Sequence, residues 1–419
     1  MFTVFRLAAR SAWNRRFTLA MTLLSIALSV ALLLGVERVR QQARADFEQS
    51  VSGTDLIVGA RTSPVQLMLY AVFRLGGATN NISWSSVEML RGQAAVAWAV
   101  PLSLGDSHRG YPVVATEPAF FTHFRYGDGR ALVLREGRAL ADIFDVVLGA
   151  EVARALGYRV GDTLALTHGM SLAGPAHADK PFTVTGILQP TGTPVDRSLH
   201  ITLAGMEAIH LDWVGGAPLP GLKIDAAHVK KFNLQPKNVT AVLVGLKNRA
   251  AVFRLQRGIA EYREEPLLAV LPGVALADLW QVVGAVERAL LAVSAMVVAV
   301  GLAGLVATLL AGLNERRREL AILRAVGAGP AHVFCLLLLE GLAVSLLGIL
   351  AGVALLDLAM LAGAPLVQAR WGLVLAPQLL TLAELQWLGL VLGVSVLASL
   401  VPGWRAYRLS LADGLVPRI

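Results

Sequence analysis

The segment FTLAMTLLSIALSVALLLGV, residues 17–36, decides the fold class of this 419-residue chain. Its 20 residues contain no charge, and a helix of that length spans roughly 30 Å, the thickness of the hydrocarbon core of a bilayer. The charged stretch Glu37-Arg38-Val39-Arg40 follows, where a signal peptide would carry small residues and a cleavage site. We therefore interpret this segment as a retained membrane-spanning helix.

Three further apolar segments predict three more spans. A second uncharged run covers residues 289–313, a third covers 333–360 and includes Glu340 and Asp357, and a fourth covers about 385–401. Hydrophobic residues make up 55% of the chain and charged residues 16%, whereas soluble domains contain about 45–50% and about 25%. The sequence therefore predicts an α-helical membrane protein with four transmembrane helices.

Arginines in the short segments beside these spans predict the orientation. Basic residues in short loops mark the cytoplasmic side, so we expect both termini and residues 314–332 in the cytoplasm and the long region between the first two spans outside. This orientation explains the net charge of +8 without nucleic-acid binding. The arginines concerned are Arg6, Arg10, Arg15, Arg16, Arg316, Arg317, Arg318, Arg324, Arg405, Arg408 and Arg418.

The region outside the membrane alternates strand-like and helical segments, which predicts an α+β domain that is possibly split into two lobes. The apolar segment 64–75 is expected to pack as core or between subunits, with the membrane surface as the alternative. The expected strands are 56–58, 111–115, 146–148, 163–167, 182–188 and 239–244, and the expected helices are 150–156, 203–210 and 249–259.

A metal site and redox chemistry are not expected. His168, His177 and Asp179 lie in or beside a loop at residues 169–181, but their spacing matches no established ligand pattern. The single cysteine, Cys335, lies in an apolar run, which excludes a disulfide within the chain and a cysteine-based metal site.

The most informative motif is NERRRELAILRAVGA, residues 314–328, between the second and third spans. It predicts an amphipathic helix that ends at Gly327, with an apolar stripe of Leu320, Leu323 and Val326. Such a helix can place its apolar face in a groove of a partner protein while its charges fix the register. An ordinary basic loop would explain the arginines but not this ordered pattern.

At this motif the chain resembles the FtsX-like permeases of the MacB and LolC/LolE superfamily, the type VII or mechanotransmission ABC transporters. Their membrane subunits carry an Arg-Arg-x-Glu-Ile-x-x-Leu-Arg-Ala-Leu-Gly-Ala type sequence here. Residues 147–162, 182–188 and 400–406 resemble further stretches of the family, and Glu340 matches a glutamate often found early in its third helix. The residues that match the motif are Arg317, Arg318, Glu319, Ile322, Arg324, Ala325, Gly327 and Ala328.

The resemblance implies a permease subunit whose motif is the coupling helix seated on a separate cytoplasmic ATPase, with Glu340 as an intramembrane polar residue. ATP and Mg²⁺ would bind that partner, because the chain has no Gly-x-x-x-x-Gly-Lys-Ser/Thr loop, and no cofactor or catalytic residue is expected here. The expected coupling residues are Arg316, Arg317, Arg318, Glu319, Leu320, Leu323, Arg324, Val326 and Gly327.

The resemblance also implies a bacterial inner-membrane location and a homodimer or a pair with a related permease. The outer region would be a MacB-like periplasmic domain, and a periplasmic adaptor or a lipoprotein client would be a further partner. Export, extraction and lipoprotein handling all remain open as its work. The alternative class is a membrane-anchored receptor or scaffold that has no ATPase partner.

The expected division of the chain follows from these segments. It consists of a cytoplasmic amphipathic helix (1–16), the first span and its stalk (17–50), the outer domain (51–275), a second stalk and span (276–313), the coupling helix and loop (314–332), the third span (333–360), an outer loop (361–382), the fourth span (383–404) and a cytoplasmic tail (405–419).

Overall fold

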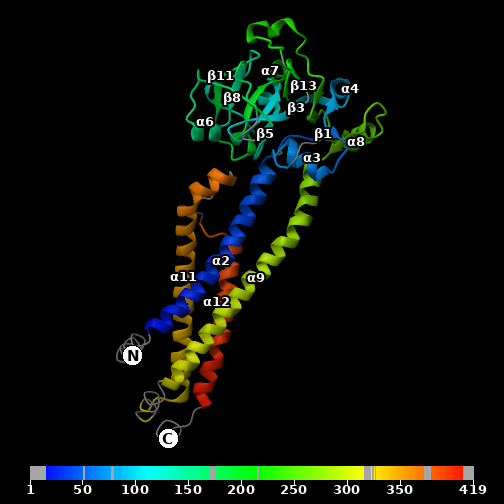
Figure 1. Ribbon diagram of the computed structural model, residues 1–419. Helices are drawn as coiled ribbons and strands as arrows, with labels where there is room; N and C mark the ends of the chain where they lie inside the picture. Colours follow the sequence, from blue (N-terminus) through cyan, green and yellow to red (C-terminus); the bar gives the residue numbers. More distant parts are fainter. Residues whose placement is uncertain are drawn as a thin grey trace. The chain divides into compact units, whose positions relative to one another are not determined.

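The computed structural model describes residues 16–50, 52–76, 80–169, 175–214, 217–219, 221–315, 322, 325, 327–371 and 379–408. These residues form two compact units. The helical unit contains residues 16–42, 284–370 and 379–408, and the α/β domain contains the described residues from 43 to 283. Figure 1 traces the chain through both units.

Four long helices carry the apolar segments of the sequence. Among the described residues they are the helices long and apolar enough to cross a membrane, which confirms the predicted four spans. They pack around a shared core that includes Ile26, Leu305, Ile349 and Leu388, one residue from each helix. The helices are α2 (Arg16–Gln49), α9 (Pro272–Glu315), α11 (Pro330–Trp371) and α12 (Leu382–Arg408).

Glycines let α11 approach α2 closely. Gly348 and Gly352 have the spacing of the Gly-x-x-x-Gly motif, which brings membrane helices into backbone contact. A Cβ atom on Gly352 would lie 2.7 Å from the carbonyl oxygen of Ala27 and 2.8 Å from the Val30 side chain. Only glycine therefore fits at this crossing.

Two helix boundaries differ from the sequence prediction. The third span was expected to end at residue 360, but α11 continues to Trp371, so the first half of the expected outer loop is helical. The leucine and alanine residues that follow residue 360 favour helix, despite Gly363 and Pro365. The fourth helix likewise continues through Pro402 to Arg408. The expected N-terminal helix and the last part of the tail lie outside the described residues.

The α/β domain is built on one large mixed sheet. Its strand order is β17-β1-β16-β3-β4-β12-β8-β11-β7, with β10 paired to β3 and β9 paired to β11. The strands are β17 (Leu267–Val270), β1 (Leu56–Ala60), β16 (Ala241–Leu246), β3 (Val96–His108), β4 (Tyr111–Thr116), β12 (Leu199–Thr202), β8 (Asp145–Leu148), β11 (Phe182–Leu188), β7 (Leu134–Gly137), β10 (Thr167–His168) and β9 (Thr163–Leu164).

Two-residue strands pair outside this sheet. They are β2 (Ile82–Ser83) with β15 (Asn238–Val239), β5 (Arg125–Tyr126) with β6 (Arg130–Ala131), and β13 (Trp213–Val214) with β14 (Ala217–Pro218). The short helices are α3 (Pro64–Ala71), α4 (Trp84–Arg91), α5 (Ala119–His123), α6 (Ala150–Leu156), α7 (Leu203–His210), α8 (Val252–Ala260) and the 3-10 turns η1 (Pro194–Arg197), η2 (Ala226–Lys231) and η3 (Arg249–Ala251).

Both faces of the sheet are covered by hydrophobic core. Along β1, Leu56 and Val58 point to one core and Ile57 points to the other, as the alternation of a strand requires. The segment predicted as core, inter-subunit contact or membrane surface forms α3, and its Leu67 and Met68 are completely buried in the second core. The core alternative is therefore confirmed for α3.

Candidate functional site

The expected coupling segment lies mostly outside the described residues. Arg316, Arg317, Arg318, Glu319, Leu320, Leu323, Arg324 and Val326 belong to the undescribed part. Gly327 is described and has a φ of 104°, a conformation that glycine adopts without strain. The helix-ending role predicted for Gly327 fits this geometry, and the other eight assignments stay predictions.

Buried contacts join the helix ends that flank this segment. Leu313 near the end of α9, Val333 and Leu337 near the start of α11, and Ala406 near the end of α12 form a small hydrophobic cluster of their own. Their side chains are at most 4% exposed. A displacement of the segment between α9 and α11 therefore acts directly on packed helix ends.

Glu340 lies one turn further along α11 and its side chain is half-buried. Its neighbour Gly341 faces α12, where a Cβ atom would lie 2.2 Å from the Ser399 hydroxyl oxygen. The helices therefore touch closely beside Glu340. The assignment of Glu340 as an intramembrane polar residue stays a prediction.

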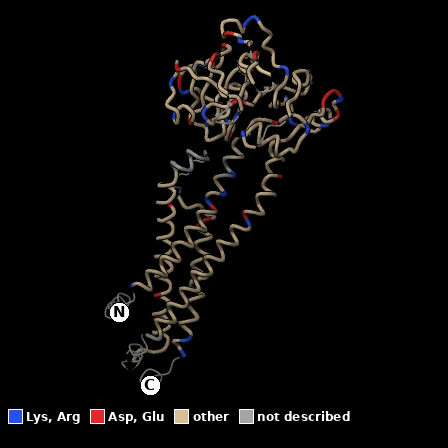
Figure 2. The backbone as a smooth tube through the Cα atoms, in the orientation of Figure 1, with Lys and Arg blue, Asp and Glu red and all other residues tan. Residues whose placement is uncertain are grey.

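A buried ion-pair cluster, Arg38–Asp357–Glu384, connects three of the four helices. The Nε atom of Arg38 in α2 donates to Oε1 of Glu384 in α12 over 2.7 Å, and its Nη1 donates to Oδ1 of Asp357 in α11 over 2.5 Å. The Arg38 and Glu384 side chains are only 6% and 1% exposed. Figure 2 shows how sparse charges are along these helices compared with the α/β domain.

The neighbouring turn of α2 contacts α9, the helix that the cluster does not reach. Arg40 donates two hydrogen bonds to Glu37, of 3.0 and 2.7 Å, and its Nη1 lies 4.0 Å from the Glu287 carboxylate of α9. Together with the Arg38–Asp357–Glu384 cluster, these contacts tie α2 to α9, α11 and α12 at one level. Sequence reasoning noted Arg38 and Asp357 but not that they pair.

An aromatic contact joins the two long helices within the α/β domain. The ring centroid of Phe47, near the end of α2, lies 4.3 Å from that of Phe73. It lies 5.7 Å from that of Trp280, near the start of α9. Leu276, one turn before Trp280, is buried in the core that also contains α3. The ends of α2 and α9 are therefore part of the domain's hydrophobic interior.

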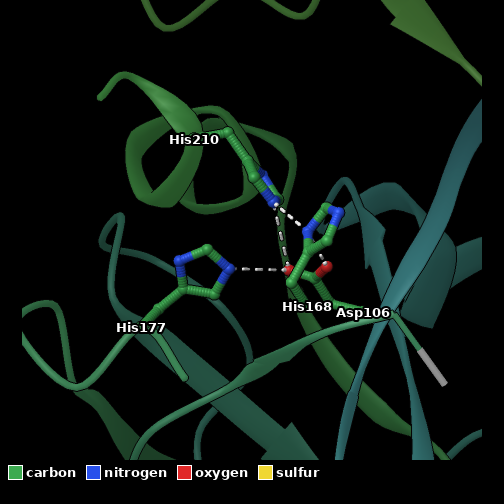
Figure 3. Close-up of side chains that lie close together, drawn as sticks. All are labelled: Asp106, His168, His177 and His210. Atoms are coloured by element: carbon green, nitrogen blue, oxygen red, sulfur yellow. Dashed lines mark hydrogen bonds and ion pairs between the residues drawn. The ribbon is translucent and has the colours of Figure 1, made fainter. Parts of the chain in front are cut away.

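In the structure, His168 and His177 do not group with Asp179, the acidic residue that lies near them in the sequence. Asp179 pairs with the ammonium of Lys180 at 3.0 Å and does not join His168 and His177. Instead Asp106 and His210, which come from distant parts of the chain, converge on these two histidines (Figure 3). Among the described residues, this is the group of potential metal ligands whose donor atoms come together.

Comparison with known families places both units. Residues 19–261 match the family model of the MacB-like periplasmic core domain, which is more than half of the chain. Residues 291–411 match the family model of the FtsX-like permease C-terminal region.

Known relatives and solved structures show more distant likeness. The chain is 27% identical over 216 residues to the lipoprotein-releasing system transmembrane protein LolC of Neisseria meningitidis serogroup B, covering 50% of this chain and 46% of that protein. It is 23% identical over 289 residues to the protein of the same name from Xylella fastidiosa strain 9a5c, covering 65% and 64%. The chain thus matches about half to two thirds of the length of these relatives.

Among solved structures, the periplasmic region of MacB from Actinobacillus actinomycetemcomitans is 13% identical with a TM-score of 0.33, covering 54% of this chain and 93% of that one. The extracellular domain of the transporter YknZ from Gram-positive bacteria is 10% identical with a TM-score of 0.28, covering 52% and 99%. These TM-scores are too low to establish a common fold.

Proposed function

The chain belongs to the family of ABC-type permeases that combine a MacB-like periplasmic core domain with an FtsX-like membrane region, and from this we propose that it transmits the force of a separate cytoplasmic ATPase to its α/β domain. ATP binding would close a pair of ATPase subunits against residues 314–328 of two copies of this chain, or of this chain and a related permease. Both termini and this segment would face the cytoplasm, and the α/β domain would lie in the periplasm.

The observation that carries the proposal is the path of α2 and α9. At 1.5 Å per residue, 34 and 44 residues of helix extend over about 51 and about 66 Å. Both exceed the roughly 30 Å of the hydrocarbon core. Each helix contributes one end to the helical unit and the other to the hydrophobic core of the α/β domain. A continuous hydrogen-bonded helix is stiff, so motion at one end reaches the other.

Ion pairs connect α2 and α9 to each other and α2 to the other two long helices. Arg38 fixes α2 to α11 and α12, and Arg40 connects α2 to α9. Charged residues within spans often line water-filled pathways, whereas this cluster pairs both of its carboxylates with Arg38 and leaves Asp357 35% exposed. It supports rigid transmission through the membrane more than passage of cargo through it.

The client is proposed from the relatives. They are named as transmembrane proteins of lipoprotein-releasing systems, so we infer lipoprotein extraction as the work of the α/β domain. The export of small molecules through a periplasmic adaptor is the competing assignment. Depletion of this chain should leave lipoproteins in the inner membrane under the first assignment and only raise drug sensitivity under the second.

The coupling segment is tested by co-purification. Glu319→Lys or Leu323→Asp should abolish recovery of the cytoplasmic ATPase with the detergent-solubilised chain, because the first reverses a register-fixing charge and the second places a charge in the apolar stripe. We expect at least about a tenfold loss of bound ATPase, which corresponds to roughly 1.4 kcal/mol.

Matched controls make the same chemical changes elsewhere. Glu261→Lys and Leu222→Asp alter exposed residues of the α/β domain and should leave ATPase recovery unchanged. If the ATPase still binds both segment variants, the coupling assignment is wrong. If wild type recovers no ATPase under any nucleotide condition, the receptor or scaffold alternative gains.

The aromatic contact is tested by separating ATPase activity from work on the client. Phe47→Ala should leave ATPase binding intact but reduce lipoprotein release about 2–10-fold, the equivalent of the roughly 0.5–1.5 kcal/mol that an aromatic pair contributes beyond its buried area. Release is measured from membrane vesicles into a soluble acceptor. Phe253→Ala, which removes a ring that is 69% exposed, is the control. Unchanged release by a folded Phe47→Ala variant would remove this contact from the transmission path.

A further inference from the structure

Four side chains from four separate segments of the α/β domain converge on one point (Figure 3). Asp106 comes from β3, His168 from β10, His177 from the segment before β11, and His210 from the last turn of α7. One ligand atom of each lies within 4.8 Å of the corresponding atoms of the others. β10 pairs with β3, and an isolated bridge between Thr167 and Ala176 joins the His177 segment to β10. The packing of α7 against these segments brings His210 to them.

The distances between donor atoms fit a tetrahedral ion. Nδ1 of His168 lies 3.0 Å from Nε2 of His210 and 3.2 Å from Oδ1 of Asp106. Oδ2 of Asp106 lies 3.6 Å from Nε2 of His210 and 3.7 Å from Nε2 of His177. A tetrahedral zinc site with ligand bonds of about 2.0–2.1 Å has ligand-to-ligand edges of about 3.3 Å. The four distances, which involve both carboxylate oxygens of Asp106, lie on either side of this value, and the chosen ligand atoms all lie within 4.8 Å of one another.

The hydrogen bond on the far side of His210 orients its ring for ligation. Nδ1 of His210 lies 2.9 Å from the carbonyl oxygen of Met206. A carbonyl only accepts, so Nδ1 carries the proton and Nε2 directs its lone pair toward Asp106 and His168. Metal-binding histidines are commonly held in this way by a carbonyl behind the ring.

Burial leaves the central groups without partners. Asp106 is 1% exposed and His177 is 0% exposed. Neither the two carboxylate oxygens nor the two ring nitrogens of these residues have a partner with hydrogen-bond geometry within the described chain. Burying such polar groups without a partner destabilises the folded state. The cluster therefore lacks the component that would stabilise it.

Among the residues that the structure describes, no cation supplies that component. The buried ammonium of Lys180 lies 2.8 Å from Asp212 and 3.0 Å from Asp179, so these two carboxylates already balance its charge. The indole of Trp213 stacks 4.1 Å from the His177 ring and shields the cluster on that side.

We propose that Asp106, His168, His177 and His210 form a tetrahedral binding site for Zn²⁺ in the α/β domain. Three imidazole nitrogens and one carboxylate oxygen are a ligand set that zinc accepts, and four protein ligands leave no open position for catalysis. The site is structural. It fixes α7 and the segment at His177 to the β3–β10 strand pair.

A zinc site here departs from the expectation that the chain binds no metal. His168, His177 and Asp179 lie close together in the sequence, but the fold groups the two histidines with Asp106 and His210 and leaves Asp179 on Lys180. The four positions span residues 106 to 210, and no linear motif relates them. The site does not depend on an ATPase partner, so it stands or falls independently of the proposed function.

The test uses the full chain, purified in detergent with a tag that contains no histidine. After metal removal and addition of one equivalent of Zn²⁺, desalted wild type should retain one zinc per chain by elemental analysis. Replacement with Co²⁺ should give the intense visible absorption of a tetrahedral cobalt centre. Zinc should also raise the thermal unfolding temperature of the α/β domain.

Variants identify the ligands. Loss of a hydrogen-bond partner behind a metal ligand weakens metal binding by about 10–100-fold. Asp106→Asn, His177→Gln and His168→Ala each remove a ligand, so each should weaken zinc binding by more than that. His168→Ala removes a side chain that is 33% exposed, so it retains the fold best. His228→Ala, which changes an exposed histidine outside the cluster, should bind zinc as wild type does.

Two results would overturn the site. One is a wild-type chain that retains no zinc after desalting and gives only the weak octahedral cobalt spectrum. The other is tight binding that survives in a folded His168→Ala variant, because the ion would then sit elsewhere. In either case the four side chains form a metal-free hydrogen-bonded cluster.

Discussion

Replacing Arg38 with leucine is expected to destabilise the helical unit by about 3–5 kcal/mol, the usual consequence of leaving buried charges without their partner. The change strands the carboxylates of Glu384, which is 1% exposed, and Asp357, which lies on a different helix. Glu384 would lose its charged donor and keep the backbone N–H of Thr381, and Asp357, which is 35% exposed, would lose the Arg38 guanidinium. Thermal unfolding of the detergent-solubilised chain, followed by circular dichroism, measures the effect.

The charge cluster also predicts a rescue. Adding Glu384→Gln and Asp357→Asn to Arg38→Leu should recover part of the lost stability, because no buried charge then remains without a partner. Arg288→Leu removes an exposed arginine of α9 and should change stability little. If Arg38→Leu unfolds at the same temperature as Arg288→Leu, the cluster does not hold the helices together.

Acid is expected to destabilise the α/β domain through His200. This residue is 0% exposed in β12, and its ring lies 5.3 Å from that of Phe120 and 5.9 Å from that of Phe121. Burial, and next the nearby Arg74 guanidinium, lower the pKa of His200 from 6.5 to about 3. The folded state therefore holds His200 neutral where the unfolded chain would protonate it.

The direction of the pH effect follows from this lowered pKa. The stabilising contribution is complete above pH 6.5 and is lost as the pH falls toward about 3, by about 1.4 kcal/mol per pH unit and roughly 5 kcal/mol over the window. Chemical unfolding of the α/β domain between about pH 7 and about pH 4 measures the slope.

His200→Phe provides the decisive comparison. It removes the titration and keeps an aromatic ring against Phe120, so its stability should depend less steeply on pH than that of wild type. His228→Phe alters an exposed histidine and should keep the wild-type slope. Equal slopes for His200→Phe and wild type would show that His200 does not remain neutral in the folded domain.

Local sequence determines much of this fold. Long apolar runs predict the four long helices, and the helices expected at 150–156 and 203–210 coincide with α6 and α7. The strand expected at 182–188 coincides with β11. The expected 249–259 helix divides into η3 and α8, and the expected strands at 163–167 and 239–244 divide in two. Side-chain periodicity and propensity are sufficient for elements of this kind.

The longest strand was missed for a physical reason. β3 runs from Val96 to His108 but contains Pro101, Gly105 and several polar residues, which local rules treat as breaks. Its pairing with β16 and β4 on either side compensates for them. Tertiary hydrogen bonding here overrides local preference, which a single sequence does not reveal.

The candidate sites were predictable only where they are local. The coupling segment is a continuous amphipathic motif, so its pattern is visible in the sequence. Arg38 and Glu384, in contrast, are 346 positions apart and each lies at the edge of an apolar run. The ligand atoms of Asp106 and His210 likewise meet only after the sheet and α7 have packed.

The sheet order has a consequence for how the protein is made. β1 has β16 and β17 as its two neighbours, so Ile57 pairs with both Leu243 and Val270. At about 5–20 residues per second, synthesis of the roughly 200 residues between them takes about 10–40 s. Until then β1 exposes two unpaired edges in the nascent chain. Unpaired strand edges favour association with other chains, so we expect residues 56–60 to be prone to aggregation until the last strand arrives.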